Sequence, residues 1–342
     1  MLPDRLTLSW PGEGPLTRLP AAWRNALLQL AVAWMGLILL TAREWGEMLH
    51  QWWDIDTYNH ILLVPIIVAW LVALRKDVLG RLTPTAWWPG IACVALALFL
   101  WFAGRVTEIN LFAQAGAVAA LQGAVLALLG PRVGAALLLP LGYMAFLVPF
   151  GDEIIPSLQT ITAKIAIALT HLSGVSATID GIYIDTAAGL FVVAEACSGV
   201  KFLIAMVALG ALVCFTAFAS WTRRAIFLLA CVVVPILANG VRAWGTIYIA
   251  QSQGVEFAAG FDHIFYGWIF FAVVVVLLLG AAWRYFEREP DEAGLSLEQI
   301  ESNSLLAILD RNLANPVALL AALAAILAFF MIGAIYAPPF LL

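Results

Sequence analysis

The sequence predicts an all-α, polytopic integral membrane protein, and both its composition and its long apolar runs indicate this class. Hydrophobic residues make up 63% of the 342 residues and charged residues only 11%, whereas about a quarter of the residues in soluble domains are charged. Apolar runs of the length that spans a bilayer, about 20 residues, recur along nearly the whole chain. We expect about nine transmembrane helices, with a small helix and hairpin insertion on the outer side just before Cys197.

Nine spans are predicted between short polar or proline-containing segments. They cover residues 25–42, 60–74, 88–104, 109–129, 134–150, 198–219, 225–250, 264–283 and 314–336. Pro140 and Pro149 interrupt the fifth span. Before the sixth span, residues 154–172 have a helical pattern, residues 175–185 alternate as a hairpin does, and residues 189–194 are strand-like.

Four regions follow from this division. Residues 1–24 form an N-terminal segment that does not resemble a cleaved signal peptide, since it contains Asp4 and Glu13. Residues 25–285 form the membrane core, residues 286–313 a polar linker, and residues 314–342 an additional membrane segment.

Basic residues predict the orientation, because Lys and Arg collect in cytoplasmic segments. An N-terminus inside the cell places 12 of the 17 Lys and Arg residues inside. These are Arg5, Arg18, Arg24, Arg75, Lys76, Arg81, Arg132, Arg223, Arg224, Arg284, Arg288 and Arg311. The linker is then cytoplasmic, while residues 151–194 and the polar ends of spans two, six, seven and eight share the outer side.

The remaining composition narrows the possible functions. The net charge of −5 and the charge pattern give no sign of nucleic-acid binding. The four cysteines have neither metal-ligand spacing nor a paired framework, so we expect no metal and no cofactor. Cys93, Cys214 and Cys231 lie inside apolar runs, where a cysteine is usually a small buried side chain.

Cys197 differs from the other three because it lies where a strand-like run changes to a long apolar helix that begins near Ser198. The positive end of the helix dipole and unpaired backbone N–H groups favour a thiolate there, and the thiolate is the nucleophilic form. Ser198 and Gly199 keep the turn small and leave room for a substrate backbone. A buried, inert cysteine is the alternative interpretation.

Arg242 is predicted near the outer end of the seventh span, where an arginine is costly unless it is paired or faces a water-filled cavity. The alternative is an interfacial arginine whose charge reaches the lipid headgroups. Asn239 lies three residues earlier and therefore on the same helix face, which favours a functional role for both.

His263 opens the eighth span directly after Asp262, and imidazole is the usual general base beside a nucleophilic cysteine. The alternative is a helix start that Asp262 caps. Glu195 has three possible partners, which are His263, Arg242 and Lys201.

Tyr58 and His60 open the second span on the same outer side, where the alternative interpretation is a helix start followed by a kink. With them, one leaflet collects a thiol, a guanidinium and an imidazole. Such a set can attack a carbonyl, neutralise its oxyanion and transfer protons.

Three ordered blocks resemble the signature blocks of exosortases, the bacterial relatives of archaeosortases. They are residues 195–201 (EACSGVK), 239–242 (NGVR) and 262–268 (DHIFYGW). Residues 58–65 (YNHILLVP) resemble a fourth block, although Ile61 stands where glycine is commoner. The similarity covers roughly residues 25–285.

The resemblance implies a multi-pass cysteine peptidase or transpeptidase that acts on secreted proteins. Their sorting signal, PEP-CTERM, consists of a Pro-Glu-Pro motif, a transmembrane helix and a basic tail. By this resemblance Cys197 is the nucleophile, Arg242 stabilises the transition state and His263 is the acid/base. Supporting roles fall to Glu195, Ser198, Gly199, Asn239, Asp262, His60 and Tyr58. Cleavage would occur on the periplasmic face of the bacterial inner membrane, followed by hydrolysis or by transfer to an unknown acceptor nucleophile.

Among exosortases, the overall sequence pattern most closely resembles the subgroup associated with exopolysaccharide loci. Many of its members have a soluble C-terminal domain, where this chain has the polar linker and one more span. Two other classes of function are alternatives. A polytopic transferase or polymerising enzyme of surface polysaccharide usually has large outer loops, which the sequence lacks. A transporter or scaffold predicts charged residues at the middle of spans, where this chain is almost purely apolar.

Overall fold

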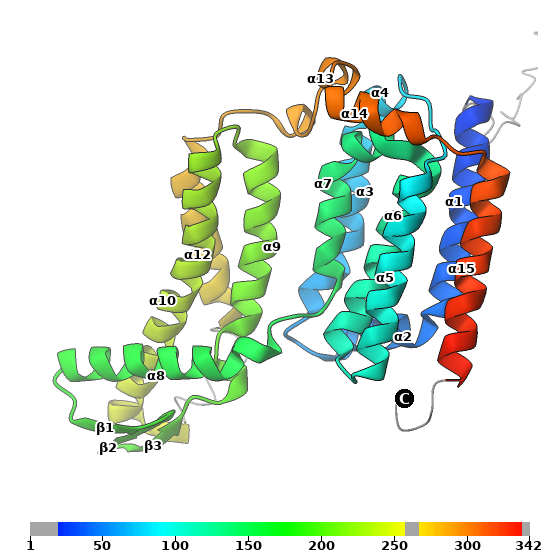
Figure 1. The fold of residues 1–342 in the computed structure, drawn as a ribbon. Helices are drawn as coiled ribbons and strands as arrows, with labels where there is room; N and C mark the ends of the chain where they lie inside the picture. The colour runs from blue at the N-terminus through cyan, green and yellow to red at the C-terminus, as the bar shows by residue number, and fades with distance from the viewer. Residues whose placement is uncertain (1–19, 257–266, 337–342) are drawn as a thin grey trace, which may run out of the picture. The chain divides into compact units, whose positions relative to one another are not determined.

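The chain folds almost entirely into helices. The computed structural model describes residues 20–256 and 267–336 (Figure 1). Within these ranges six helices are long and apolar enough to cross a membrane, or eight if each of two bent helix pairs forms one span. This finding confirms the all-α polytopic class, while the count of nine spans stays a prediction.

Most of the longer helices overlap predicted spans, residues 155–172 form the helix predicted before the sixth span, and the helix at residues 42–54 was not predicted. They are α1 (Ala21–Leu40), α2 (Ala42–Asp54), α3 (Val64–Leu74), α5 (Trp88–Val106), α6 (Asn110–Ala136), α8 (Ile155–Leu172), α9 (Val200–Ala217), α10 (Trp221–Gln253), α12 (Gly267–Trp283) and α15 (Pro316–Tyr336). Short α-helices are α4 (Lys76–Leu79), α7 (Leu138–Tyr143), α13 (Leu297–Glu301) and α14 (Ser304–Leu309). Short 3-10 helices are η2 (Asn59–Leu63), η3 (Met144–Leu147), η4 (Asp152–Ile154), η5 (Glu195–Cys197), η7 (Pro290–Glu292) and η8 (Asp310–Asn312).

The fourth and fifth predicted spans are divided differently from the expectation. Helix α6 continues to Ala136 through a kink at Gly130, whose φ of 85° and ψ of 173° are not helical. Pro131 follows the kink directly, and a proline has no N–H for the helical ladder. The fifth predicted span is therefore short, and it bends by 63° into η4 and α8.

A three-stranded antiparallel sheet follows α8. Strands β1 (Ala177–Asp180), β2 (Tyr183–Thr186) and β3 (Gly189–Val192) lie in sequence order. The turn between β1 and β2 contains Gly181 with a φ of 61°, which glycine adopts without steric cost. The hairpin predicted in residues 175–185 is present, and the strand-like run adds the third strand.

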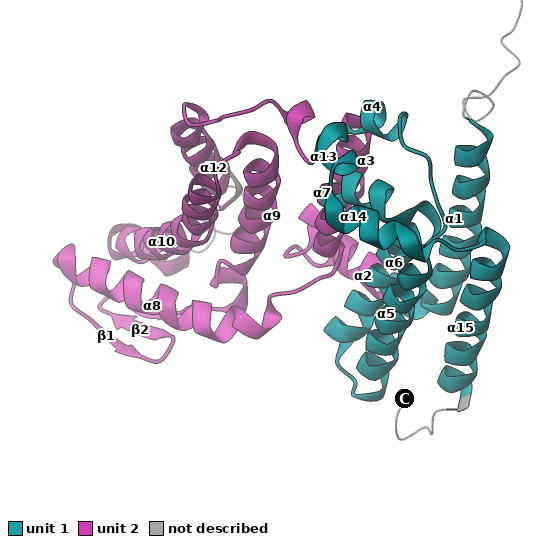
Figure 2. Cartoon of the chain, turned by 45° about the horizontal axis from the view of Figure 1, so that its top comes forward, with its two compact units in different colours: residues 1–45, 75–138, 295–342 teal, residues 46–74, 139–294 magenta. Residues whose placement is uncertain are grey.

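The chain divides into two compact units, coloured separately in Figure 2. Unit 1 contains residues 1–45, 75–138 and 295–342, and unit 2 contains residues 46–74 and 139–294. In unit 1, α5 and α6 pack closely at glycines. A Cβ on Gly104 or Gly116 would lie 2.3 Å from a backbone nitrogen of the other helix, so only glycine fits at either position.

The second half of the polar linker binds to unit 1. Arg132 Nε lies 2.6 Å from Asp310 Oδ2, and the Arg75 guanidinium donates to the carbonyl of Leu295. The indole of Trp87 donates to the Leu309 carbonyl at 2.9 Å. The linker is thus an ordered part of the fold in this region.

In unit 2, α8 runs crosswise to α9 and α10 at the end of these helices that also carries the sheet (Figure 1). One face of α8 is buried and includes Ala163 and Ala166. Together with Ile184 from β2 and Ile247 from α10, these residues form an apolar cluster. Burial of this cluster fixes the sheet and α8 against the segment that leads to Cys197.

Candidate functional site

Cys197 lies in a tight turn between β3 and α9. It is the last residue of η5, and its N–H donates to the Ala194 carbonyl at 2.9 Å. The next N–H, from Ser198, donates to the Glu195 carbonyl at 3.0 Å. Helix α9 then begins at Val200, two residues later than the start predicted near Ser198, so the thiol lies three residues before the first residue of the helix.

Asn239 of α10 holds this turn in place. Its Nδ2 donates to the Cys197 carbonyl at 2.8 Å and to Thr162 Oγ1 at 3.0 Å. Thr162 Oγ1 in turn donates to the Ser198 carbonyl at 3.5 Å. Asn239 is 4% exposed and Thr162 is 1% exposed, and removing a partner from a buried hydrogen bond costs about 1–3 kcal/mol. Two helices distant in sequence therefore fix the carbonyls of Cys197 and Ser198, which belong to consecutive peptide groups.

A glycine is required at position 199 for two reasons. Its φ of 84° lies in the left-handed region, and a Cβ would lie 2.7 Å from Asn239 Cγ. Gly199 is also the residue that caps α9. Its missing side chain lets the turn approach the Asn239 amide closely enough for the hydrogen bond to the Cys197 carbonyl.

Arg242 lies one helical turn after Asn239 and is 7% exposed. Its guanidinium carbon lies 6.0 Å from the centre of the Phe202 ring, within the range of a cation–π contact. A Cβ on Gly267, the first described residue of α12, would lie 3.8 Å from the same carbon. Helices α9, α10 and α12 therefore all contribute to the surroundings of this buried charge, and the prediction that Asn239 and Arg242 share a helix face is correct.

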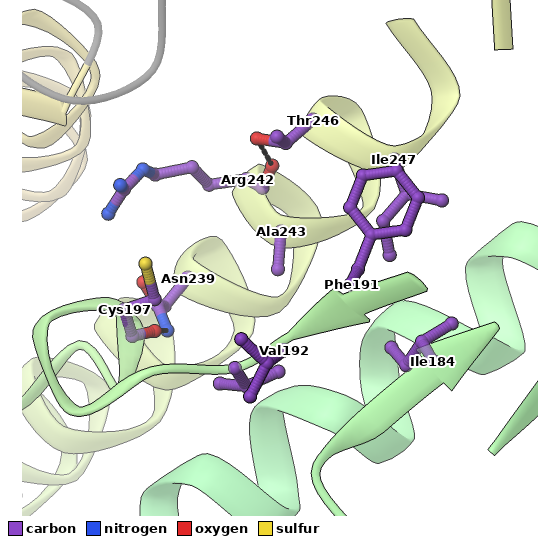
Figure 3. A pocket seen from close by; sticks show the side chains of 10 residues that line it. Ile184, Phe191, Val192, Cys197, Asn239, Arg242, Ala243, Thr246 and Ile247 are labelled. Carbon is purple, nitrogen blue, oxygen red and sulfur yellow. Dashed lines mark hydrogen bonds between the residues drawn. The ribbon is translucent and has the colours of Figure 1, made fainter. Parts of the chain in front are cut away.

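A cavity of about 70 Å³ joins the thiol and the guanidinium (Figure 3). Its polar lining consists of Cys197, Asn239, Arg242 and Thr246, and its apolar lining comes from β2, β3 and α10. In Figure 3 Cys197 and Arg242 approach the same space from the turn and from α10, respectively. A thiol at a helix N-terminus beside a buried cation can form a covalent bond to an electrophile whose developing negative charge the cation stabilises.

Tyr58 and His60 lie elsewhere in unit 2 and do not line this cavity. Tyr58 Oη donates to Asp152 Oδ1 at 2.6 Å, which ties the segment before η2 to the start of η4 and α8. Burial raises the pKa of Tyr58, and the hydrogen bond to Asp152 raises it further, so the phenol stays protonated and remains a donor. His60 Nδ1 lies 3.1 Å from the Thr57 carbonyl. Tyr58 therefore supports α8, the helix that carries Thr162.

The other predicted site residues differ in their placement. Ser198 is buried, and its Oγ accepts a hydrogen bond from the Val200 N–H at 3.3 Å. Glu195 is exposed at the start of η5. Asp262 and His263 lie outside the described residues.

Sequence reasoning did not find three residues around the turn. Thr162 is described above. Gln159, one turn earlier on α8, donates its Nε2 to the Val193 carbonyl at 2.8 Å. Phe202 stacks on Phe271 of α12 with ring centres 4.6 Å apart and so supports the Arg242 contact. The one signal in the sequence for Thr162 and Gln159 is that both are polar residues on the buried face of α8.

Replacing Gly199 with alanine is expected to lower the free energy of unfolding by about 1–3 kcal/mol, because the new Cβ meets Asn239 and the backbone is left-handed. The melting temperature in detergent and the rate of Cys197 alkylation by a maleimide measure the effect. Gly245→Ala is the matched control, since nothing lies within 4 Å of a Cβ there. Equal stability and equal alkylation rates for Gly199→Ala and wild type would contradict the close approach.

Comparison with known proteins identifies a family. A family model described as transmembrane exosortase (Exosortase_EpsH) matches residues 52–280, which is more than half of the chain. The matched region contains Cys197, Asn239, Arg242 and the whole sheet. No curated protein and no solved structure matches.

Proposed function

The chain belongs to the transmembrane exosortase family of membrane-embedded sorting enzymes, and we propose that it is a cysteine peptidase or transpeptidase that cleaves C-terminal sorting signals. The observation that carries this proposal is the cavity shared by Cys197 and Arg242. Both reactions need a nucleophile and a stabiliser of negative charge at one carbonyl. The two side chains supply these functions from a rigid turn and a buried helix position.

In the proposed reaction the Cys197 thiolate attacks the carbonyl carbon of the scissile peptide bond. The carbonyl oxygen becomes an oxyanion, which the Arg242 guanidinium stabilises. When the C–N bond breaks, the leaving amine takes a proton and a thioester to Cys197 remains. Water or an acceptor amine then attacks the thioester and releases the thiolate.

His263 is the proposed proton donor to the leaving amine and the base for the incoming nucleophile. It lies four residues before Gly267, and Gly267 lies beside the Arg242 guanidinium. Asp262, directly before it, and Glu195 are the two carboxylates that we propose as its orienting groups. Asn239, Ser198 and Gly199 act through the backbone of the Cys197 turn and are positioning residues.

The proposed substrates are secreted proteins with a PEP-CTERM tail, anchored by its transmembrane helix in the bacterial inner membrane. The N-terminus of the enzyme is cytoplasmic and the cavity opens on the periplasmic side, which follows from the distribution of Lys and Arg. The preference of Lys and Arg for the cytoplasmic side also keeps the basic end of the substrate tail in the cytoplasm. Its Pro-Glu-Pro motif then reaches the outer surface of the bilayer, where the Cys197 turn lies.

The test is co-expression of the full chain with a secreted reporter that carries the complete tail, followed by gel electrophoresis. We expect a smaller reporter only when the enzyme is present. A matched reporter with Ala-Ala-Ala in place of Pro-Glu-Pro, but with the same helix and basic end, should remain full length. Equal processing of both tails would remove the motif as the recognition element, and no processing of either would contradict the proposed substrate.

A further inference from the structure

Strand β3 has an open hydrogen-bonding edge. The Val193 N–H donates to the Ile182 carbonyl at 3.0 Å, so Ile182 and Val193 form a hydrogen-bonded pair. Pairs alternate along an antiparallel ladder, and Phe191 with Ile184 is therefore the next bonded pair. The backbone groups of Leu190 and Val192 consequently point away from β2, toward the edge where the described part of the chain has no fourth strand.

The two edges of the sheet differ. At the β1 edge the Ala177 carbonyl is already engaged, because it lies 2.8 Å from Nε2 of His171 at the end of α8. At the β3 edge one acceptor is engaged locally, since the Ala194 N–H donates to the Val192 carbonyl at 3.0 Å. Among the described residues, the Leu190 N–H, the Leu190 carbonyl and the Val192 N–H have no backbone partner and remain available. Their side chains are also accessible, with Leu190 64% and Val192 49% exposed.

The open edge leads directly to the candidate nucleophile. Phe191, Val192 and Val193 line the same cavity as Cys197 and Arg242. Only the four residues 193–196 separate β3 from Cys197 along the chain. The Val192 carbonyl is already bonded, so the pairing of an extended peptide with β3 would stop at Val192. Beyond this point the peptide would enter the cavity.

We propose that the substrate's sorting peptide binds as a fourth strand along the β3 edge, which positions its scissile carbonyl over Cys197. This inference rests on the proposed function and adds the mode of recognition. Strand addition provides affinity through main-chain hydrogen bonds, while pockets select alternate side chains. Leu190 and Val192 lie two residues apart, so their side chains are on one face of the strand and contact alternate residues of the peptide.

A Pro-x-Pro sequence suits such an edge. Residues two apart in a strand direct their N–H positions to the same side, so both prolines can place their missing donors away from β3. The central residue then pairs with Leu190 through its own N–H and carbonyl. The added strand has its other edge open to solvent, which is where proline is tolerated in sheets.

The first experiment removes one edge donor without disturbing the β2 ladder. In the full-length enzyme, Leu190→Pro deletes the N–H that points outward, and we expect processing of the tailed reporter to fall about tenfold. Leu190→Ala shortens the side chain but keeps the donor, and Ile179→Pro deletes the equivalent outward N–H of β1. Ile179→Pro should process within about twofold of wild type, and Leu190→Ala should retain more activity than Leu190→Pro, so that the difference between the two Leu190 variants measures the lost donor. Equal maleimide labelling of Cys197 in all variants verifies that the site is folded.

A second experiment measures the pairing directly. In a Cys197→Ala background, Leu190→Cys should form disulfides with single cysteines placed in the reporter tail at alternate positions, because side chains alternate between faces. Ile179→Cys should form none. Full processing by Leu190→Pro, or cross-linking without alternation, would overturn strand addition while the enzyme remains active. Failure of wild type to process any tailed reporter would instead overturn the proposed function.

Discussion

Replacing Cys197 with alanine is expected to abolish reporter processing, by at least about four orders of magnitude, because removal of a catalytic nucleophile leaves only binding and charge stabilisation. Cys197→Ser should be equally inactive, since a hydroxyl is a far weaker nucleophile than a thiolate. The measurement is the ratio of full-length to cleaved reporter over time. A polysaccharide transferase or polymerising enzyme would not depend on this thiol.

Cys93→Ser is the matched control for the thiol. Cys93 is also half-buried, but it lies in the first half of α5 in unit 1. We expect it to process the reporter at the wild-type rate. Unchanged processing by Cys197→Ala, with the enzyme present at equal amount in the membrane, would refute the nucleophile assignment and with it the thioester mechanism.

Arg242→Lys is expected to lower kcat by roughly 100- to 1000-fold, the usual cost of removing one group that stabilises an oxyanion. Lysine keeps the charge but loses the planar guanidinium that lies against Phe202 and reaches the cavity. KM should change little, because the negative charge on the carbonyl oxygen develops in the transition state. Single-turnover and steady-state kinetics in detergent separate the two effects.

Arg223→Lys is the control on the same helix. Arg223 lies near the opposite end of α10, where its Nη1 is 3.3 Å from Glu287 Oε1. An exposed ion pair of this kind contributes little to stability, so both kcat and the melting temperature should stay close to wild type. A parallel rise of KM and loss of stability in Arg242→Lys, with kcat retained, would identify Arg242 as a packing residue.

The sequence predicts the membrane class and most of the long apolar helices, because apolar length is a local signal. It also brings Asn239 and Arg242 to one helix face, since three residues nearly complete a helical turn. The approach of Asn239 to the Cys197 carbonyl was not predictable in this way. That contact depends on how α10 meets the turn, and 42 residues separate the two partners.

The contacts of Thr162 were also not predictable from local signals. A threonine in an amphipathic helix is an ordinary surface residue unless its neighbours are known, and here its hydroxyl lies between Asn239 and the Ser198 carbonyl. Hydropathy does not distinguish two helices from one helix that bends, so the sequence predicts a break after residue 129 where the structure has a kink at Gly130. Its φ of 85° is a backbone property that hydropathy does not report.

The pair formed by Arg132 and Asp310 has a consequence for biosynthesis. The two residues are 178 positions apart, so at a translation rate of about 5–20 residues per second Arg132 emerges roughly 10–35 s before its carboxylate. During that interval it is an uncompensated cation beside newly inserted helices, and such cations determine which way a span is inserted. The finished fold then pairs the same guanidinium with the linker. Charge counts made on the mature surface therefore understate the signal that the growing chain presented to the insertion machinery.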